Sequence, residues 1–185
     1  MFADSTLTPK EAIRLCALGT LELAHAPLRY SELAGAIRHF TSRITGPSLD
    51  ILGTSIELLK FEGLVEPIDG IGMEDDATLQ LTQKGLDELE TLMTSRIRSA
   101  GGEVNKLITT LKLRFLHLLD IEAQCEQADL LIENCETELA RLDDLRAYHS
   151  KDPGYLTAWL DHDIALLEAH LDWLEAFRER LDPIS

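Results

Sequence analysis

Residues 48–92 constrain the fold of this chain most, because helix-like and strand-like patterns alternate within a short stretch. A run of apolar residues at helical spacing stops at Gly63, and short apolar runs flank a loop rich in glycine and acids, as strands do. The expected elements are a helix (49–61), a strand that begins at 64, a second strand (79–81) and a helix that begins after 82. A helix, a two-stranded wing and a following helix make a winged helix, which places one helix in the major groove of DNA.

The length of 185 residues suffices for one core, or for a small domain with a helical appendage. No apolar run approaches the roughly 18 to 20 residues of a membrane span, and the N-terminus lacks the segments of a secretory signal. Three cysteines, an odd number without the spacing of metal ligands, are typical of reduced thiols. The sequence therefore predicts a cytoplasmic protein without a membrane partner.

The net charge of −16 is unusual for a protein that binds phosphate groups. The acid is unevenly distributed: residues 1–98 hold 9 Lys and Arg against 15 Asp and Glu, a net of −6. Residues 99–185 hold 8 against 18, a net of −10. Most of the negative charge therefore lies in the second half, and this distribution permits a nucleic-acid-binding face in the first half.

Start signals mark the helices of the first half. Thr8, Pro9 and Glu11 predict an N-cap, a first helical position and a capping box. Ser31 is the expected cap of a second helix, and Ser48 that of a third. The third helix would bury a stripe at 3,4,3 spacing, formed by Leu49, Leu52, Ile56 and Leu59.

A stretch of small residues at 100–102 marks the expected boundary between a winged-helix DNA-binding domain (1–100) and a helical dimerisation domain (101–185). The second domain begins with apolar residues at 4,3 spacing over 104–118 and continues through three heptads. The heptad seam, typical of a coiled coil, consists of Ile121, Cys125, Ala128, Ile132, Cys135, Leu139 and Leu142.

The last helix carries apolar residues on two sides. One stripe runs from Leu160 to Leu181, and the other consists of Trp159, Leu166, Trp173 and Phe177. One partner helix cannot cover both stripes, and an exposed stripe of this size is rare in monomers. The sequence therefore predicts a symmetric homodimer built from the C-terminal helices.

Four short motifs lie at the boundaries of the expected elements. They are Pro27-Leu28-Arg29-Tyr30-Ser31-Glu32-Leu33 with Ile37, then Leu52, Ile56 and Leu59 with Glu62-Gly63-Leu64-Val65, then Leu81-Thr82 with Gly85, and Leu171-Asp172-Trp173-Leu174-Glu175. Together they resemble the second helix, the recognition helix with its wing, and the dimerisation arm of the PadR-like transcriptional regulators, more closely their AphA-like (virulence-activator) branch. The resemblance covers nearly the whole chain and implies a DNA-binding regulator.

The sequence departs from the family pattern where the resemblance implies DNA contacts. Ser31 and Gly53 stand where the family has tyrosine. Basic residues of the family's recognition helix are replaced, and an Arg-Lys-aromatic segment before the second wing strand becomes Asp75-Asp76-Ala77-Thr78. The replaced helix positions are Thr54, Glu57 and Leu58. Each replacement removes a phosphate or base contact that the resemblance would otherwise imply.

Two sets of residues are the candidates for DNA contact. The outward positions of the third helix would face the bases: Ser48, Ile51, Thr54, Ser55 and Leu58. The available cations would contact phosphates: Lys10, Arg14, Arg29, Arg38, Arg43 and Lys60. The alternatives are an amphipathic helix that only packs, and basic residues that are only scattered over the surface.

Other patterns have both a structural and a functional interpretation. The acidic wing segment, Glu74 to Asp76, favours a solvated turn over a device that repels DNA or docks a basic protein. The histidines, His162 and His170 among them, lack metal-ligand spacing, so no metal site is expected. Cys125 and Cys135 favour buried apolar roles over a redox switch. Tyr155 and the last helix's aromatic stripe favour packing between subunits over a pocket for a small aromatic effector.

The sequence shows no nucleophile–base pair, phosphate-binding glycine loop or paired catalytic carboxylates, so we expect neither an enzyme nor a cofactor. The predicted fold is mainly α: an N-terminal winged helix of three helices and a two-stranded wing, followed by a coiled-coil-like dimerisation arm. The predicted function is a homodimeric transcriptional regulator that binds double-stranded DNA. The alternative is a winged-helix adaptor that binds protein and not DNA.

Overall fold

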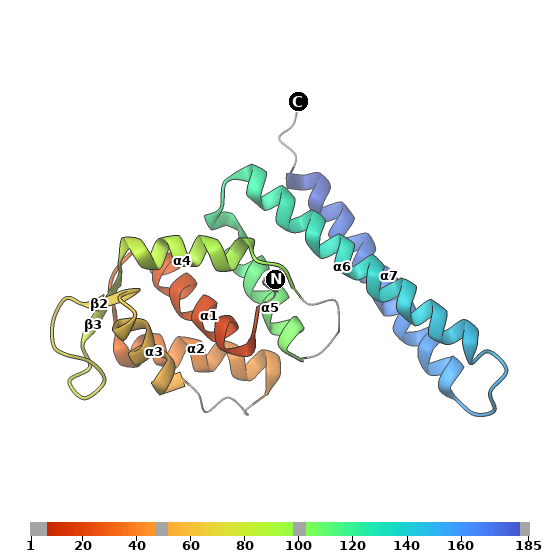
Figure 1. The fold of residues 1–185 in the computed structure, drawn as a ribbon, viewed down its shortest axis with the longest axis horizontal. Coiled ribbons are helices and arrows are strands. Elements are labelled where there is room, and N and C mark those ends of the chain that lie inside the picture. The colour runs from red at the N-terminus through yellow and green to blue at the C-terminus, as the bar shows by residue number, and fades with distance from the viewer. Residues whose placement is uncertain (1–6, 47–51, 98–102, 182–185) are drawn as a thin grey trace, which may run out of the picture. The chain divides into compact units, whose positions relative to one another are not determined.

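The computed structural model describes residues 7–46, 52–97 and 103–181 (Figure 1). They divide into two compact units, the first containing every element up to η1 and the second containing α6 and α7. The elements are α1 (Pro9–Ala24), β1 (Leu28–Arg29), α2 (Tyr30–Thr45), α3 (Leu52–Phe61), β2 (Val65–Pro67), β3 (Thr78–Leu81), α4 (Gln83–Thr94), α5 (Glu103–Phe115), the 3-10 turn η1 (Leu116–Leu118), α6 (Ile121–Tyr148) and α7 (Leu156–Leu181).

Helix α1 is the centre of the first unit and contacts α2, α3, α4 and α5. Its predicted capping box is confirmed: Thr8 Oγ1 accepts from the Glu11 backbone N–H at 3.3 Å, and Glu11 Oε2 accepts from the Thr8 N–H at 2.7 Å. Nine of the ten residues of α1 from Ala12 to Leu21 are buried, and Arg14 is the exception. A helix buried on most of its faces needs several neighbours, and the other helices of the unit supply them.

Helix α5 belongs to the core of the first unit. Phe115 is fully buried, and its ring lies so close to Gly19 of α1 that a Cβ at Gly19 would be 2.5 Å from it. The compact division therefore falls after Leu118, about one helix later than the boundary expected at residues 100 and 101. The apolar stripe of residues 104–118 is the reason for the difference, since its period predicts a helix but not which neighbour the helix packs against.

A three-stranded antiparallel sheet in the order β1-β3-β2 forms the wing. Leu28 pairs with Leu79, and Val65 pairs with Leu81. The expected two strands are present, and the short extended segment before α2 adds a third strand at the edge. The fold class predicted from the sequence is thus confirmed, and the sheet ties the start of α2 to the wing.

The joint between the wing and α4 explains the Leu81-Thr82 and Gly85 motif. Thr82 Oγ1 donates to the Gly63 carbonyl at 2.7 Å and accepts from the Gly85 backbone N–H at 3.1 Å. A Cβ at Gly85 would be 2.1 Å from the Leu64 carbonyl oxygen, so only glycine fits there. The first turn of α4 is therefore fixed against the strand that follows α3.

The expected cap of α2 was wrong. The helix begins at Tyr30, with Arg29 as its N-cap residue, and Glu32 Oε2 accepts from the Arg29 backbone N–H at 3.0 Å. Ser31 lies one residue inside the helix, and its hydroxyl donates to Asp76 Oδ2 at 3.0 Å. The helix starts earlier because β1 runs directly into it, leaving no separate capping residue between them.

The second unit is a helical hairpin in which α6 and α7 pack against each other (Figure 1). Of the predicted heptad positions, Ala128 and Cys135 of α6 are buried, Ile121 is 47% exposed, and the other four are half-buried. The buried face of α6 also includes Gln127 and Leu131, which the predicted seam omits. The other stripe of α7 remains at the surface: Trp159 is 60%, Leu166 58% and Trp173 44% exposed, and Phe177 is half-buried.

In the described part of the chain, no helix combines the length and apolarity needed to cross a bilayer.

Candidate nucleic-acid interface

Helix α3 is the candidate recognition helix, and its inner side anchors it in the first unit. Ile56 and Leu59 are 0% and 2% exposed, and the helix contacts α1, α2 and β2. Among the predicted base-facing residues, Thr54 and Ser55 lie on α3, and Leu58 is half-buried on it. Ser48 and Ile51 lie outside the described residues. Their role in reading bases stays a prediction.

Arg14, a predicted phosphate contact, is held inside the first unit. Its Nη2 lies 2.6 Å from Glu62 Oε2 and its Nη1 lies 2.6 Å from Glu88 Oε1, and the side chain is 19% exposed. Burial disfavours the charged form of Arg14, but its hydrogen bond to Glu88 and the charges of both carboxylates outweigh burial and raise the pKa of Arg14. Arg14 thus joins α1 to α4 and to the end of α3, and its charge is already balanced.

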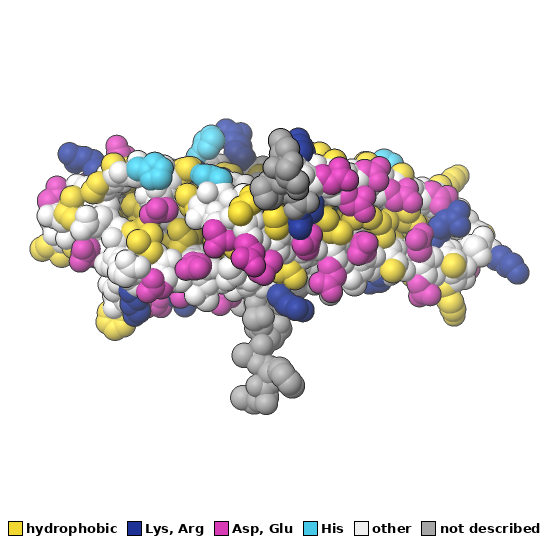
Figure 2. All heavy atoms as spheres, turned by 90° about the horizontal axis from the view of Figure 1, so that it is seen from above, with side chains coloured by type: hydrophobic (Ala, Val, Ile, Leu, Met, Phe, Trp, Pro, Cys, Tyr) yellow, Lys and Arg dark blue, Asp and Glu magenta, His cyan; other side chains and the backbone are white. Residues whose placement is uncertain are grey.

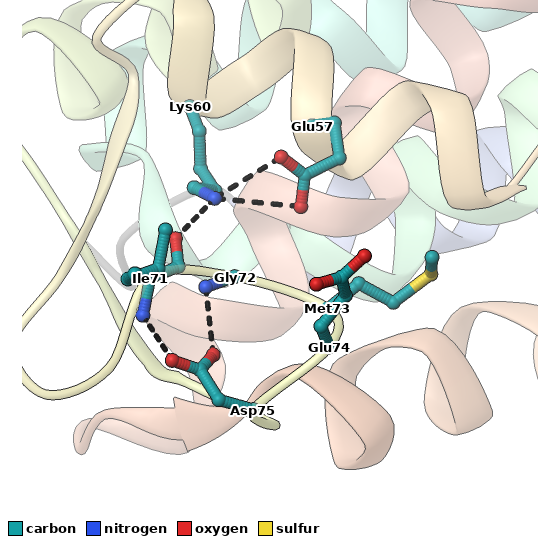
Figure 3. A pocket seen from close by; sticks show the side chains of 7 residues that line it. All are labelled: Glu57, Lys60, Ile71, Gly72, Met73, Glu74 and Asp75. Carbon is teal, nitrogen blue, oxygen red and sulfur yellow. Dashed lines mark hydrogen bonds and ion pairs between the residues drawn. The ribbon is translucent and has the colours of Figure 1, made fainter.

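Lys60 of α3, a second predicted phosphate contact, is also paired with a carboxylate. Its Nζ lies 3.0 Å from Glu57 Oε2 and donates to the Ile71 carbonyl at 2.5 Å, and the side chain is 15% exposed (Figure 3). The lysine therefore ties the loop between β2 and β3 to α3. A phosphate could reach it only in competition with Glu57 and this carbonyl.

The remaining predicted phosphate contacts lie at the surface. Lys10, Arg38 and Arg43 are exposed, and among the described residues no ion pair involves them. The side chain of Arg29 is 64% exposed and lies 3.7 Å from Asp76. Arg43 occupies the last turn of α2, closest in sequence to α3. Of the six predicted phosphate contacts, these four are the ones that the fold leaves accessible.

The aspartates of the wing loop (residues 68–77) have a structural role that their charge alone did not indicate. Asp75 accepts from the backbone N–H groups of Ile71 at 2.6 Å and Gly72 at 2.9 Å (Figure 3), and these bonds lower its pKa. Asp69 accepts from the Thr78 N–H at 2.5 Å, and this bond lowers its pKa.

Asp76 extends this network to α2. Its carboxylate accepts from the backbone N–H of Ser31 at 2.8 Å and from the Ser31 hydroxyl, and both bonds lower its pKa. Short polar side chains commonly bond to nearby backbone groups in turns, which sequence reasoning could have applied to the aspartates of this loop. The loop is therefore held on both sides, by Asp76 to α2 and by Lys60 to α3.

A pocket of about 470 Å³ opens between α3 and the wing loop (Figure 3). The apolar part of its lining is exposed, with Ile71 at 82% and Met73 at 59%. Nothing in the sequence pattern indicated this pocket, because its walls come from a helix and from a loop without periodicity. Its lining residues are Glu57, Lys60, Ile71, Gly72, Met73, Glu74 and Asp75.

The first unit also buries groups whose chemistry differs from that of the interface. Lys112 of α5 is 1% exposed, its Nζ donates to the Met93 carbonyl at the end of α4, and burial lowers its pKa to about 7. Burial raises the pKa of the Cys16 thiol to about 11, so that it is protonated at neutral pH. Among the described residues, no group of three or more His, Cys, Asp or Glu side chains could hold a metal ion.

Comparison with known proteins identifies a family and finds solved structures that are similar to this chain. The sequence matches the family described as "putative AphA-like transcriptional regulator" over residues 2–178, whereas no curated protein matches it. Bacillus subtilis PadR, crystallised in complex with operator DNA, is similar over 91% of this chain and 98% of its own, with 14% identity and a TM-score of 0.36. Because the family match spans both compact units, the chain belongs to the AphA-like family of transcriptional regulators.

Proposed function

We propose that this protein binds double-stranded DNA as a homodimer in the cytoplasm and thereby regulates transcription. The observation that carries the proposal is the winged helix in a chain of this family, with α3 anchored by Ile56 and Leu59 and followed by a three-stranded wing. In this arrangement α3 enters the major groove with Thr54, Ser55 and Leu58 toward the bases. Ser48 and Ile51 complete the set of proposed base contacts.

Phosphate contacts in this proposal come from the accessible cations and not from the buried ones. Lys10, Arg38 and Arg43 are exposed, whereas Arg14 and Lys60 are already paired with carboxylates. Three contacts per subunit would give a dimer a slope of about −5 in a plot of log binding constant against log salt concentration. This modest slope suits a regulator of net charge −16.

The hairpin supports the proposed homodimer. Trp159, Leu166 and Trp173 recur at intervals of seven residues on α7 and lie exposed, although their counterparts in the seam are covered. An aromatic stripe left at the surface of a helix is typical of an interface, and a two-fold axis would pair it with its own copy. Such a pairing holds two α3 helices at a fixed spacing, as binding to two half-sites about one helical turn apart requires.

Modulation by an effector is part of the proposal. A small aromatic molecule that inserts beside Trp173 and Phe177, whose rings stack at 5.3 Å, would act only if it favours one spacing of the recognition helices over another. The measurement is the affinity for DNA with and without such a compound, and an unchanged affinity across a set of aromatic acids and amines would contradict this part.

The test of DNA binding is a salt titration with the DNA upstream of the protein's own gene. We expect site-preferring binding that weakens as salt rises. Arg43→Ala should weaken binding to every sequence alike, whereas Thr54→Ala should change the preference among sequences. Arg141→Ala, which removes an exposed arginine of the hairpin instead, is the matched control and should change neither. Absence of binding even at low salt would overturn the proposal and favour the protein-binding adaptor.

A further inference from the structure

The pocket between α3 and the wing loop is preformed by contacts on both of its sides. Lys60 Nζ donates to the Ile71 carbonyl, and Asp75 accepts two backbone N–H groups of the same loop (Figure 3). Gly72 is buried at its floor, where a Cβ would lie 2.5 Å from Lys60 Nζ. A pocket with a fixed shape loses little conformational freedom when it is filled, which favours binding.

The charge of the pocket selects a cation. Three carboxylates, those of Glu57, Glu74 and Asp75, face one ammonium group, and that group is already paired with Glu57. Glu74 is exposed and makes no hydrogen bond or ion pair within the described ranges, so its charge is available to a ligand. DNA phosphates and anionic lipid surfaces are repelled by this excess of carboxylates.

The apolar lining narrows the class of cation. Its apolar side chains are accessible, with Ile71 82% and Met73 59% exposed. Arginine and lysine side chains combine an aliphatic stem with a charged end, so they can contact both parts of such a pocket. A volume of about 470 Å³ is within the usual range for a site that takes a small ligand or a few side chains, and too small for a folded domain.

We propose that this pocket docks a basic segment of a partner protein, which places an arginine or lysine among Glu57, Glu74 and Asp75 and packs aliphatic groups on Ile71 and Met73. Of the pocket residues only Lys60 was a candidate for DNA contact, and it is engaged by Glu57 and Ile71. The same subunit can therefore contact DNA through α3 and a protein through the side of α3 next to the wing. The inference does not depend on DNA binding.

Methionine methyl NMR tests the proposal directly. The chain has three methionines, of which Met73 lies in the pocket and Met93 is fully buried in the core, so the Met73 methyl reports binding and the Met93 methyl reports the fold. The probe is an eight-residue peptide that alternates arginine and leucine, compared with the same peptide carrying uncharged citrulline. We expect the arginine peptide to shift the Met73 signal and the citrulline peptide to bind at least tenfold more weakly.

Two variants distinguish docking in the pocket from general attraction to an acidic protein. Glu74→Gln should weaken binding of the arginine peptide about tenfold or more, as expected for loss of a charge-assisted contact. Glu90→Gln removes an exposed carboxylate of α4 outside the pocket and should leave binding unchanged. Equal weakening by both variants, equal binding of the citrulline peptide, or no shift of Met73 at millimolar peptide would each overturn the proposal.

A duplex of the upstream DNA is titrated in the same way, because the other macromolecule that could meet this surface is DNA. A Met73 shift of similar size with DNA, abolished by added arginine peptide, would show that the pocket is part of the DNA-binding face and would overturn the docking proposal. If the arginine peptide shifts the Met73 signal but the protein does not bind DNA, the result contradicts the proposal of a DNA-binding regulator and leaves the docking proposal standing.

Discussion

The two units of this chain use similar apolar periods but bury them to different extents. In the first unit the stripes of α1 and α5 are enclosed, and Leu15 and Phe115 have no exposed surface. In the hairpin only the residues between α6 and α7 are covered, while Trp159 and Trp173 remain at the surface. Figure 2 shows hydrophobic side chains between the acidic ones along the hairpin. One unit encloses its apolar stripes within a single chain, and the other leaves an apolar face at its surface.

The distribution of tryptophan makes this contrast measurable. Both tryptophans of the chain lie on α7, so tryptophan fluorescence reports on the hairpin. Far-UV circular dichroism reports on all the helices. Urea unfolding followed by the two signals therefore separates changes in the first unit from changes in the second.

The largest effect is expected for Phe115→Ala. The substitution removes a fully buried ring that packs on Gly19, and such truncations cost about 3–5 kcal/mol of unfolding free energy. The loss should appear in the circular dichroism transition of the first unit, with the fluorescence transition changed much less. Phe61→Ala is the matched control, because Phe61 is 89% exposed and its loss should cost less than about 0.5 kcal/mol. A loss below about 1 kcal/mol for Phe115→Ala would contradict the placement of α5 in this core.

The next effect concerns the exposed face of α7. Replacing Trp159 and Trp173 together by alanine should raise the dissociation constant of the dimer at least tenfold, since exposed aromatic residues of an interface contribute most of its free energy. Sedimentation at several concentrations measures the dimer, and Asp172→Asn on the same helix is the control. A wild-type protein that is monomeric at all concentrations would contradict the proposed homodimer.

Helix α1 and the wing show how far the sequence determined the fold. The capping box at Thr8, the turn at Gly63 and the Thr82 and Gly85 joint are local signals, and each lies where it was predicted. Helix α5 was predicted as a helix but assigned to the second domain, because a 4,3 period does not name the partner of a stripe. Only the packing of Phe115 on Gly19 decides that.

The candidate interface was less predictable than the fold. The segment Glu74 to Asp76 forms a largely exposed turn, as predicted, but the sequence did not indicate the hydrogen bonds that its aspartates accept. Asp75 accepts backbone N–H groups of its own loop, and Asp76 accepts that of Ser31 in α2. The carboxylates beside Arg14, those of Glu62 and Glu88, lie far from it in the chain, so its sequence context did not show that its charge is balanced. Lys60 pairs with Glu57 three residues earlier on the same helix, a local spacing that sequence reasoning could have used.

A third prediction concerns the pH dependence of the stability of the first unit. It rests on Lys112, which is buried in the core of that unit. Its pKa is about 7 when folded and near 10.5 when unfolded, so between these values the unfolded state binds the extra proton. Stability of the first unit therefore rises with pH from 7 toward 10, by at most about 1.4 kcal/mol per pH unit. Lys112→Met should abolish this slope and stabilise the unit at pH 7 by about 1–2 kcal/mol. Urea unfolding at pH 7 and pH 9 measures the free energy of unfolding, and Lys106→Met, which replaces an exposed lysine, is the control. If Lys112→Met leaves the pH dependence unchanged, that dependence belongs to another titratable group.

The smallest effect is expected in the wing loop, which neither core encloses. Asp75→Ala removes the acceptor of the Ile71 and Gly72 backbone N–H groups, and their hydrogen exchange should become about fivefold faster, as loss of an ordinary hydrogen bond predicts. Glu74→Ala, beside it, should leave these rates unchanged.

The pKa of Asp75 is lowered by these bonds, so in the wild type the protection of the two N–H groups against exchange is complete above the ordinary aspartate pKa of about 3.9. The protection is lost as pH falls through the lower pKa that Asp75 has in the folded protein. Unchanged exchange in Asp75→Ala would mean that Lys60 and Asp76 hold the loop without Asp75, and that the order of the pocket depends on its two ends.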